Sequence, residues 1–195
     1  MGPALSPAVH GTRTFFSKVL PLNVLGHLLG GMFLGLLAAL LGLAISLLLS
    51  RETAMAAVGA IVLVYALADL LGVRLWRPNS KWQVPQGFRR TPYVGTMSLL
   101  WGLALGAGWA TMNVTSAFFA TFLAMAVVEP WLAFAGGMLF GVAQALTVLL
   151  ALGGGDFDVV LERFSAVLRQ VRVAAVVSAA VGVALAASLI TTSMQ

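Results

Sequence analysis

The side chains of this sequence that could take part in chemistry are few, and most of them are uncharged. Thr111, Asn113, Thr115 and Ser116 stand close together in an otherwise apolar stretch, with Met112 among them. Hydroxyl and amide groups can coordinate an ion or hydrogen-bond a small solute. We therefore predict a substrate path at this polar island (residues 111–116). The alternative is that these side chains only satisfy backbone groups freed by a helix break.

Three further polar side chains lie in or near apolar segments. Gln144 is in the middle of one, near Thr147, and either faces the same path or makes one interhelical hydrogen bond. His27 is either a ligand or pH-sensing group or, as we favour, an interfacial residue. For Asp69 we expect an interfacial ion pair with an arginine rather than proton coupling.

Other kinds of chemistry find no support in the sequence. The chain has no cysteine and only two histidines, so thiol chemistry and a histidine-rich metal site are excluded. The sequence also has no phosphate-binding loop, no paired carboxylates and no Ser/His/Asp set. We therefore expect a protein that is not an enzyme and that uses no cofactor or metal.

The composition indicates the class of protein that positions these residues. Of the 195 residues, 61% are hydrophobic and 9% are charged, and the mean hydropathy is +1.02. Soluble domains carry about a quarter charged residues. The chain is therefore predicted to be an all-α integral membrane protein in the lipid bilayer of a bacterial inner (plasma) membrane. The formal charge of +5 is explained by basic cytoplasmic loops, not by nucleic acid.

Four apolar segments are long enough to span a membrane: residues 22–49, 53–73, 131–152 and 173–191. Ser50, Arg51 and Glu52 are predicted to form the turn between the first two. A fifth stretch, residues 93–128, has an apolar part that would be about 48 Å long as one straight helix, against a hydrocarbon core of about 30 Å. The polar island lies in its middle, so a broken third helix is expected.

Charge counting favours five crossings, with six as the alternative. Five crossings place ten basic residues on the cytoplasmic side and one outside, whereas six place seven inside and four outside. The N-terminus is then cytoplasmic. Residues 1–21 form a short basic leader, and residues 22–195 form a single membrane domain.

Two of the spans resemble each other. The segment Gly30-Gly-Met-Phe-Leu-Gly35 is echoed by Gly136-Gly-Met-Leu-Phe-Gly141. Glycines spaced four apart let helices approach closely in lipid, which predicts helix packing at Gly31, Gly35, Gly137 and Gly141. With five crossings the two spans run in opposite directions, which would make an inverted repeat, a common construction in transporters.

Two loops have features of their own. The loop before the third span is basic and aromatic, and its Lys81, Arg89 and Arg90 are candidates for contact with lipid headgroups or a partner. Residues 156–171 have apolar side chains at helical spacing, which predicts an amphipathic helix on the membrane surface.

The stretch Gly102-Leu-Ala-Leu-Gly-Ala-Gly-Trp-Ala-Thr-Met-Asn-Val-Thr115 resembles a segment of the CcdA/DsbD family, the cytochrome c biogenesis and thiol–disulfide carriers. In that family a helix breaks around a redox cysteine, and Met112 stands at the cysteine's place. The resemblance implies a cysteine-less, N-terminally shortened relative. Because disulfide exchange needs a thiolate, a shared fold would serve another activity.

Two functions follow from these observations. The first is movement of a small solute or ion through a site at the broken helix. The second is a non-catalytic membrane subunit that packs on a partner, in a redox or protein-maturation assembly, or on a second copy of itself.

Overall fold

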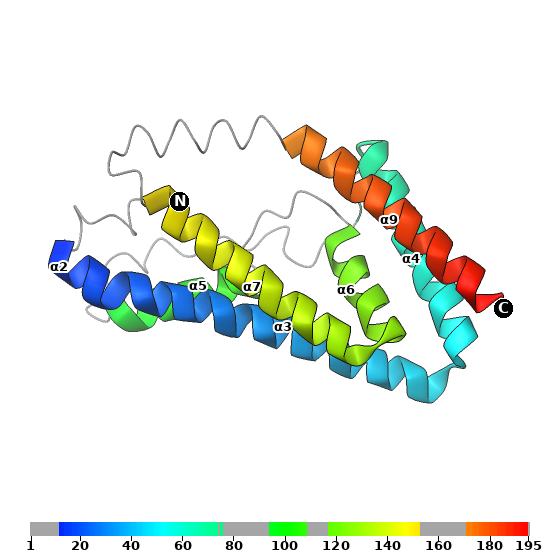
Figure 1. Ribbon diagram of the computed structural model, residues 1–195, viewed down its shortest axis with the longest axis horizontal. Coiled ribbons are helices and arrows are strands. Elements are labelled where there is room, and N and C mark those ends of the chain that lie inside the picture. Colours follow the sequence, from blue (N-terminus) through cyan, green and yellow to red (C-terminus); the bar gives the residue numbers. More distant parts are fainter. Residues whose placement is uncertain (1–11, 74, 76–93, 109–116, 153–170, 195) are drawn as a thin grey trace.

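A computed structural model describes residues 12–73, 75, 94–108, 117–152 and 171–194 (Figure 1). All regular elements in these ranges are helical, as expected for an all-α membrane protein. They are, in chain order, α2 (Thr12–Thr14), the π-helical turn η2 (Phe15–Val19), α3 (Leu20–Leu48), α4 (Arg51–Leu70), α5 (Val94–Gly106), α6 (Ala117–Val128), α7 (Pro130–Leu152) and α9 (Val171–Ser193).

Four of the helical stretches have the length and hydropathy to cross a membrane. They are Phe16–Leu48, Arg51–Leu70, Pro130–Leu149 and Val176–Ser193. Their positions agree with the four spans predicted from the sequence to within a few residues. The first is longer than expected, because η2 continues into α3.

The turn between α3 and α4 is shorter than predicted. Arg51 and Glu52 belong to the first turn of α4, so the connection is only Leu49 and Ser50. The Ser50 side chain accepts a hydrogen bond from the Thr53 backbone N–H at 3.3 Å, which caps the helix N-terminus. Glu52 is favourable there because the N-terminal end of a helix dipole is positive.

The helices form two groups. In Figure 1, α3 runs beside α5 and α7, and α4 pairs with α9 further along the sequence. Helix α6 contacts α3, α4 and α7 and so joins the two groups. Buried Val58, Val62, Ala124 and Leu189 belong to the apolar core between α4, α6 and α9.

Helices α5 and α6 lie beside successive parts of α3 and follow its direction. Ser98 of α5 bonds to Val19 at the start of α3, and Gly42 near the end of α3 is in close contact with Ala126 of α6. At 13 and 12 residues, the two helices are about 20 and 18 Å long, so neither crosses a core of about 30 Å alone.

The packing places small residues inside and large apolar residues outside. Helix α3 buries Gly26, Gly30, Gly31, Gly35 and Gly42. Its large side chains are exposed, among them Leu29, Phe33, Leu36, Leu40 and Leu43. This distribution is unfavourable in water, but it is typical of helices that pack closely through small residues within lipid.

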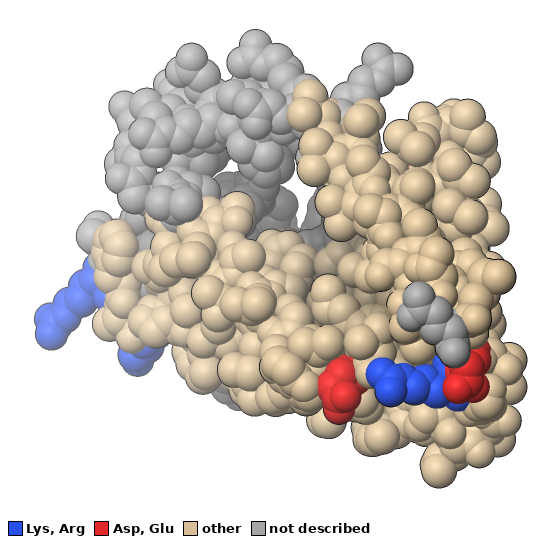
Figure 2. Space-filling model, turned by 45° about the vertical axis from the view of Figure 1, so that its right-hand side comes forward, with Lys and Arg blue, Asp and Glu red and all other residues tan. Residues whose placement is uncertain are grey.

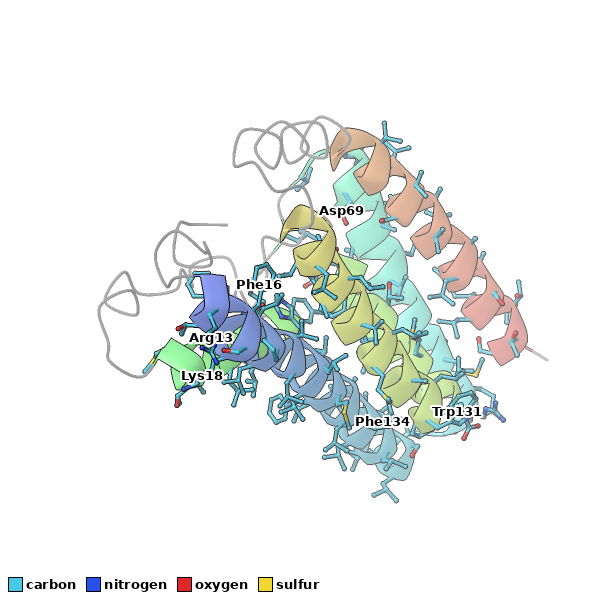
Figure 3. The ribbon with its side chains drawn as sticks, turned by 60° about the vertical axis from the view of Figure 1, so that its left-hand side comes forward. Arg13, Phe16, Lys18, Asp69, Trp131 and Phe134 are labelled. Atoms are coloured by element: carbon cyan, nitrogen blue, oxygen red, sulfur yellow. The ribbon has the colours of Figure 1, made fainter. Side chains whose placement is uncertain are left out.

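Charged side chains in the described ranges lie near helix ends. Figure 2 shows blue atoms at the left end of one face and blue and red atoms toward the lower right, with uncharged surface between them. In Figure 3, Arg13 and Lys18 mark one end of the long helix, and Trp131 lies at the opposite end of the molecule. An uncharged band between two charged ends matches a protein that spans a bilayer.

Candidate site: a buried polar cluster at the end of α5

Two polar side chains of α3 are completely buried. Asn23 and His27 have no exposed surface, and they lie one helical turn apart on the same face of α3. Neighbouring helices enclose the His27 side chain. Its interfacial position, which concerns depth in the membrane, stays a prediction. Helix α3 begins earlier than the sequence indicated, so His27 lies well inside the helix.

Residues of helix α5 form hydrogen bonds with the face of α3 that carries Asn23 and His27. The Asn23 side-chain Nδ2 donates to the Ser98 backbone oxygen at 3.2 Å, and the Ser98 hydroxyl donates to the Val19 oxygen at 2.6 Å. Ser98 is itself buried, with 5% of its surface exposed. These two bonds fix the register of α5 against α3. We call Asn23, His27, Ser98 and the neighbouring Trp101 the buried polar cluster.

The hydrogen bond of His27 defines which ring nitrogen carries the proton. His27 Nδ1 lies 2.8 Å from the Asn23 backbone oxygen. A carbonyl oxygen can only accept, so Nδ1 must be the donor. In the neutral imidazole the other nitrogen, Nε2, then has a free lone pair and acts as an acceptor.

Three buried polar atoms of the cluster have no hydrogen-bond partner: Asn23 Oδ1, His27 Nε2 and Trp101 Nε1. Buried polar atoms are almost always paired, with protein or with a bound molecule. Leaving one unpaired costs about 1–3 kcal/mol. These three atoms, on α3 and α5, are therefore candidates for hydrogen bonds to a bound polar molecule.

Glycines make this close arrangement of helices possible. A β-carbon at Gly26 would lie 2.8 Å from the Leu103 nitrogen, and one at Gly106 would lie 2.7 Å from His27 Cα. Gly141 of α7 approaches the His27 oxygen from another side, where a β-carbon would be 2.6 Å away. His27 is therefore at the junction of α3, α5 and α7.

Of the cluster residues, His27 lies next to the end of α5, where it contacts Gly106. The helix closes with hydrogen bonds from Ala107 N to Leu103 O and from Gly108 N to Leu105 O, 2.8 and 3.0 Å long. Gly108 has a φ of +74°, a left-handed conformation that ends helices and that glycine adopts without strain. The helix thus ends at Gly106, directly before the predicted polar island.

Several predicted site residues lie outside the described ranges. They are the polar island with Thr111, Met112, Asn113, Thr115 and Ser116, the loop residues Lys81, Arg89 and Arg90, and most of the predicted amphipathic helix 156–171. Of the others, Gln144 is half-buried on α7 and Asp69 is half-buried in the last turn of α4. Thr147 is exposed and bonds to the Ala143 oxygen of its own helix at 2.8 Å.

The sequence reasoning missed Asn23, Ser98 and Trp101. The sequence does contain a pattern that indicates Asn23. Asn23 and His27 are four residues apart in an apolar run, with Gly26 between them. Their spacing places two polar groups on one glycine-lined helix face. Ser98 gave no such signal, since a serine in a membrane helix usually bonds to its own backbone.

The two copies of the glycine motif pack on each other. A β-carbon at Gly31 would lie 2.7 Å from Gly141 Cα, and one at Gly137 would lie 2.6 Å from Gly35 Cα. Gly35 meets Ala133 and Phe134, while Gly141 meets His27 and Leu28. Each contact of one copy thus has a counterpart in the other, with the motifs antiparallel.

Metal binding has no support in the described part of the chain, which holds no group of three His, Cys, Asp or Glu residues able to share an ion. Compared with known protein families, curated proteins and solved structures, the chain matches none of them significantly. The site must therefore be interpreted from its own geometry.

Proposed function

We propose that this membrane protein moves a small solute or ion, and that the buried polar cluster forms part of the path together with the polar island. The observation that carries this proposal is the set of three buried, unpaired polar atoms on the packed helices α3 and α5. Unpaired polar groups are costly in a lipid-embedded bundle, and they are retained where they serve a substrate or ion.

The position of the cluster supports a path rather than an isolated packing defect. His27 is in contact with Gly106, two residues before the left-handed Gly108. Interrupted helices in transporters place free backbone groups beside the substrate. Thr111, Asn113 and their neighbours follow directly in the sequence, so their hydroxyl and amide groups would extend the same path.

We further propose that α5 and α6 are the two halves of one broken crossing, which gives five crossings in total. The contacts of Ser98 with Val19 and of Ala126 with Gly42 support this count, because they lie at opposite ends of α3. On this count α3 and α7 cross in opposite directions, as an inverted repeat requires.

A second sequence echo supports the inverted repeat. Helix α4 contains Ala56-Ala-Val-Gly59 and α9 contains Ala179-Ala-Val-Gly182. A β-carbon at Gly59 would lie 3.3 Å from the Ala186 oxygen, and one at Gly182 would lie 3.0 Å from the Ala66 Cβ. The repeat unit would then be a pair of helices, α3–α4 in one half and α7–α9 in the other.

The likeness to the CcdA/DsbD family remains a proposal about fold. The end of α5 at Gly106 falls within the stretch that resembles the family's broken helix, which supports it. The redox activity is not carried over, since this chain has no cysteine.

A flux assay on the full chain in proteoliposomes tests the function. The wild-type protein should accelerate the passage of at least one of water, urea, glycerol, K⁺ and Cl⁻. Asn113→Leu, Thr111→Val and Asn23→Leu should lower that flux about tenfold or more, because each removes a side-chain group that is proposed to hydrogen-bond to the solute. Thr147→Val is the matched control and should have wild-type flux.

The alternative function, a membrane subunit that packs on a partner, predicts different results in the flux assay. If the chain is a packing subunit, none of these solutes passes, and the polar-island variants behave as wild type. In that case Gly31→Leu or Gly137→Leu would abolish co-purification of a membrane partner. Circular dichroism of each variant separates these outcomes from loss of folding.

A further inference from the structure

The donor or acceptor character of the unpaired atoms in the buried polar cluster limits which solutes can bind there. Resting on the proposed function, we propose that the solute is a small uncharged molecule that donates an N–H or O–H hydrogen bond, and that His27 Nε2 and Asn23 Oδ1 accept it.

The acceptor character of both atoms follows from their bonded neighbours. The Asn23 amide nitrogen must face the Ser98 oxygen, since two oxygens cannot hydrogen-bond, and this leaves Oδ1 as the free atom. His27 Nδ1 must donate to the Asn23 oxygen, which leaves Nε2 with its lone pair. Both free atoms therefore require a donor from the bound molecule.

Trp101 adds one donor. Its indole nitrogen is buried without a partner, and an indole N–H can only donate. Gly26 of α3 packs against the backbone of Leu99, Gly102 and Leu103, so the turn of α5 that carries Trp101 lies against α3 between Asn23 and His27. An alcohol or an amide carries both a donor and an acceptor, which matches the two kinds of unpaired atom in the cluster.

The composition of the three helices that meet at His27 disfavours an ion. From end to end, helices α3, α5 and α7 carry no Asp, Glu, Lys or Arg. An ion would lose its hydration with no opposite charge to compensate. Two acceptor atoms are also far fewer than the six to eight oxygens typical of hard cations such as Ca²⁺.

The flux of probes of different charge tests the solute class. Urea and glycerol should pass, and K⁺ and Cl⁻ should not. His27→Leu should lower urea flux about tenfold, as expected for one lost buried hydrogen bond. His27→Gln should retain part of it, because the glutamine Oε1 can still accept. Thr147→Val should have wild-type flux.

A nitrogen-15 NMR measurement tests the acceptor independently of transport. His10→Gln leaves His27 as the only histidine. In lipid, its spectrum should show a protonated Nδ1 and an unprotonated Nε2, and added urea should shift the Nε2 resonance. A protonated Nε2, or an Nε2 that does not respond to any passing solute, would overturn the inference.

The failures of the two proposals are distinguishable. If only K⁺ or Cl⁻ passes and the cluster variants abolish that flux, the proposed function stands and the uncharged class is wrong. If no probe passes through folded protein, the proposed function fails. A urea-dependent Nε2 shift would then still support the binding of an uncharged donor at His27.

Discussion

Gly31 and Gly137 face each other across the interface of α3 and α7, and neither has room for a side chain. A β-carbon on either glycine would collide with the backbone oxygen of the other. Backbone cannot move aside as a flexible side chain can, so these two positions set the distance between the helices. The polar cluster depends on that distance, because Gly141 of the same motif contacts His27.

Two adjacent glycines of α7 should respond differently to substitution. Gly137→Ala should lower the free energy of unfolding by about 1–3 kcal/mol, since it overpacks against backbone. A β-carbon at Gly136 would come too close to the Met125 sulfur, at 2.9 Å, but that side chain can rotate away, and Phe122 Cε1 at 3.6 Å is at an ordinary contact distance. Gly136→Ala should therefore be nearly neutral. Thermal unfolding in detergent, followed by circular dichroism, compares the two, and equal losses would contradict this account of the interface.

The hydroxyl of Ser98 should contribute to the stability of the α3–α5 pair. Ser98→Ala removes the buried bond to the Val19 oxygen, and we expect a loss of about 1 kcal/mol. Ser46→Ala is the control, because exposed Ser46 bonds only to the Leu43 oxygen within its own helix. Unfolding by titration with a denaturing detergent measures both losses. A Ser98 variant no less stable than the Ser46 variant would show that this bond does not hold α5.

Ser50 should stabilise the start of α4. Ser50→Ala removes the cap on the Thr53 N–H and should cost about 1 kcal/mol. Ser50→Asp should keep or increase the stability, because aspartate also caps and its charge is favourable at a helix N-terminus. The midpoint of thermal unfolding should thus fall for alanine only, and a similar fall for both variants would rule out capping as the cause.

Accessibility labelling tests whether α5 and α6 form one crossing. The chain has no native cysteine, so single cysteines can be placed directly at Glu52, Glu129, Met194 and Val73. All four residues are exposed. In intact cells, a membrane-impermeant thiol reagent should label Glu52→Cys, Glu129→Cys and Met194→Cys alike, and should not label Val73→Cys. If Glu129→Cys and Val73→Cys behave alike, both labelled or both protected, α5 and α6 return to the same side, which contradicts one crossing.

Apolar composition and the length of the apolar runs are enough to predict the class of this protein and the position of its long helices. Long apolar runs in lipid must be helical, because every backbone group has to be satisfied within its own segment. The runs 53–73 and 131–152 therefore predicted α4 and α7 to within a few residues. The glycine motif likewise predicted a close helix contact, since only small residues allow one.

The polar cluster was decided by the tertiary structure. Asn23 and His27 are close in sequence, but Ser98 is 75 positions from Asn23, and only the packing of α5 against α3 brings them together. Composition and periodicity describe one helix at a time and do not define which faces of different helices meet. The burial of His27 was not predicted for this reason, because burial depends on neighbours that the local sequence does not specify.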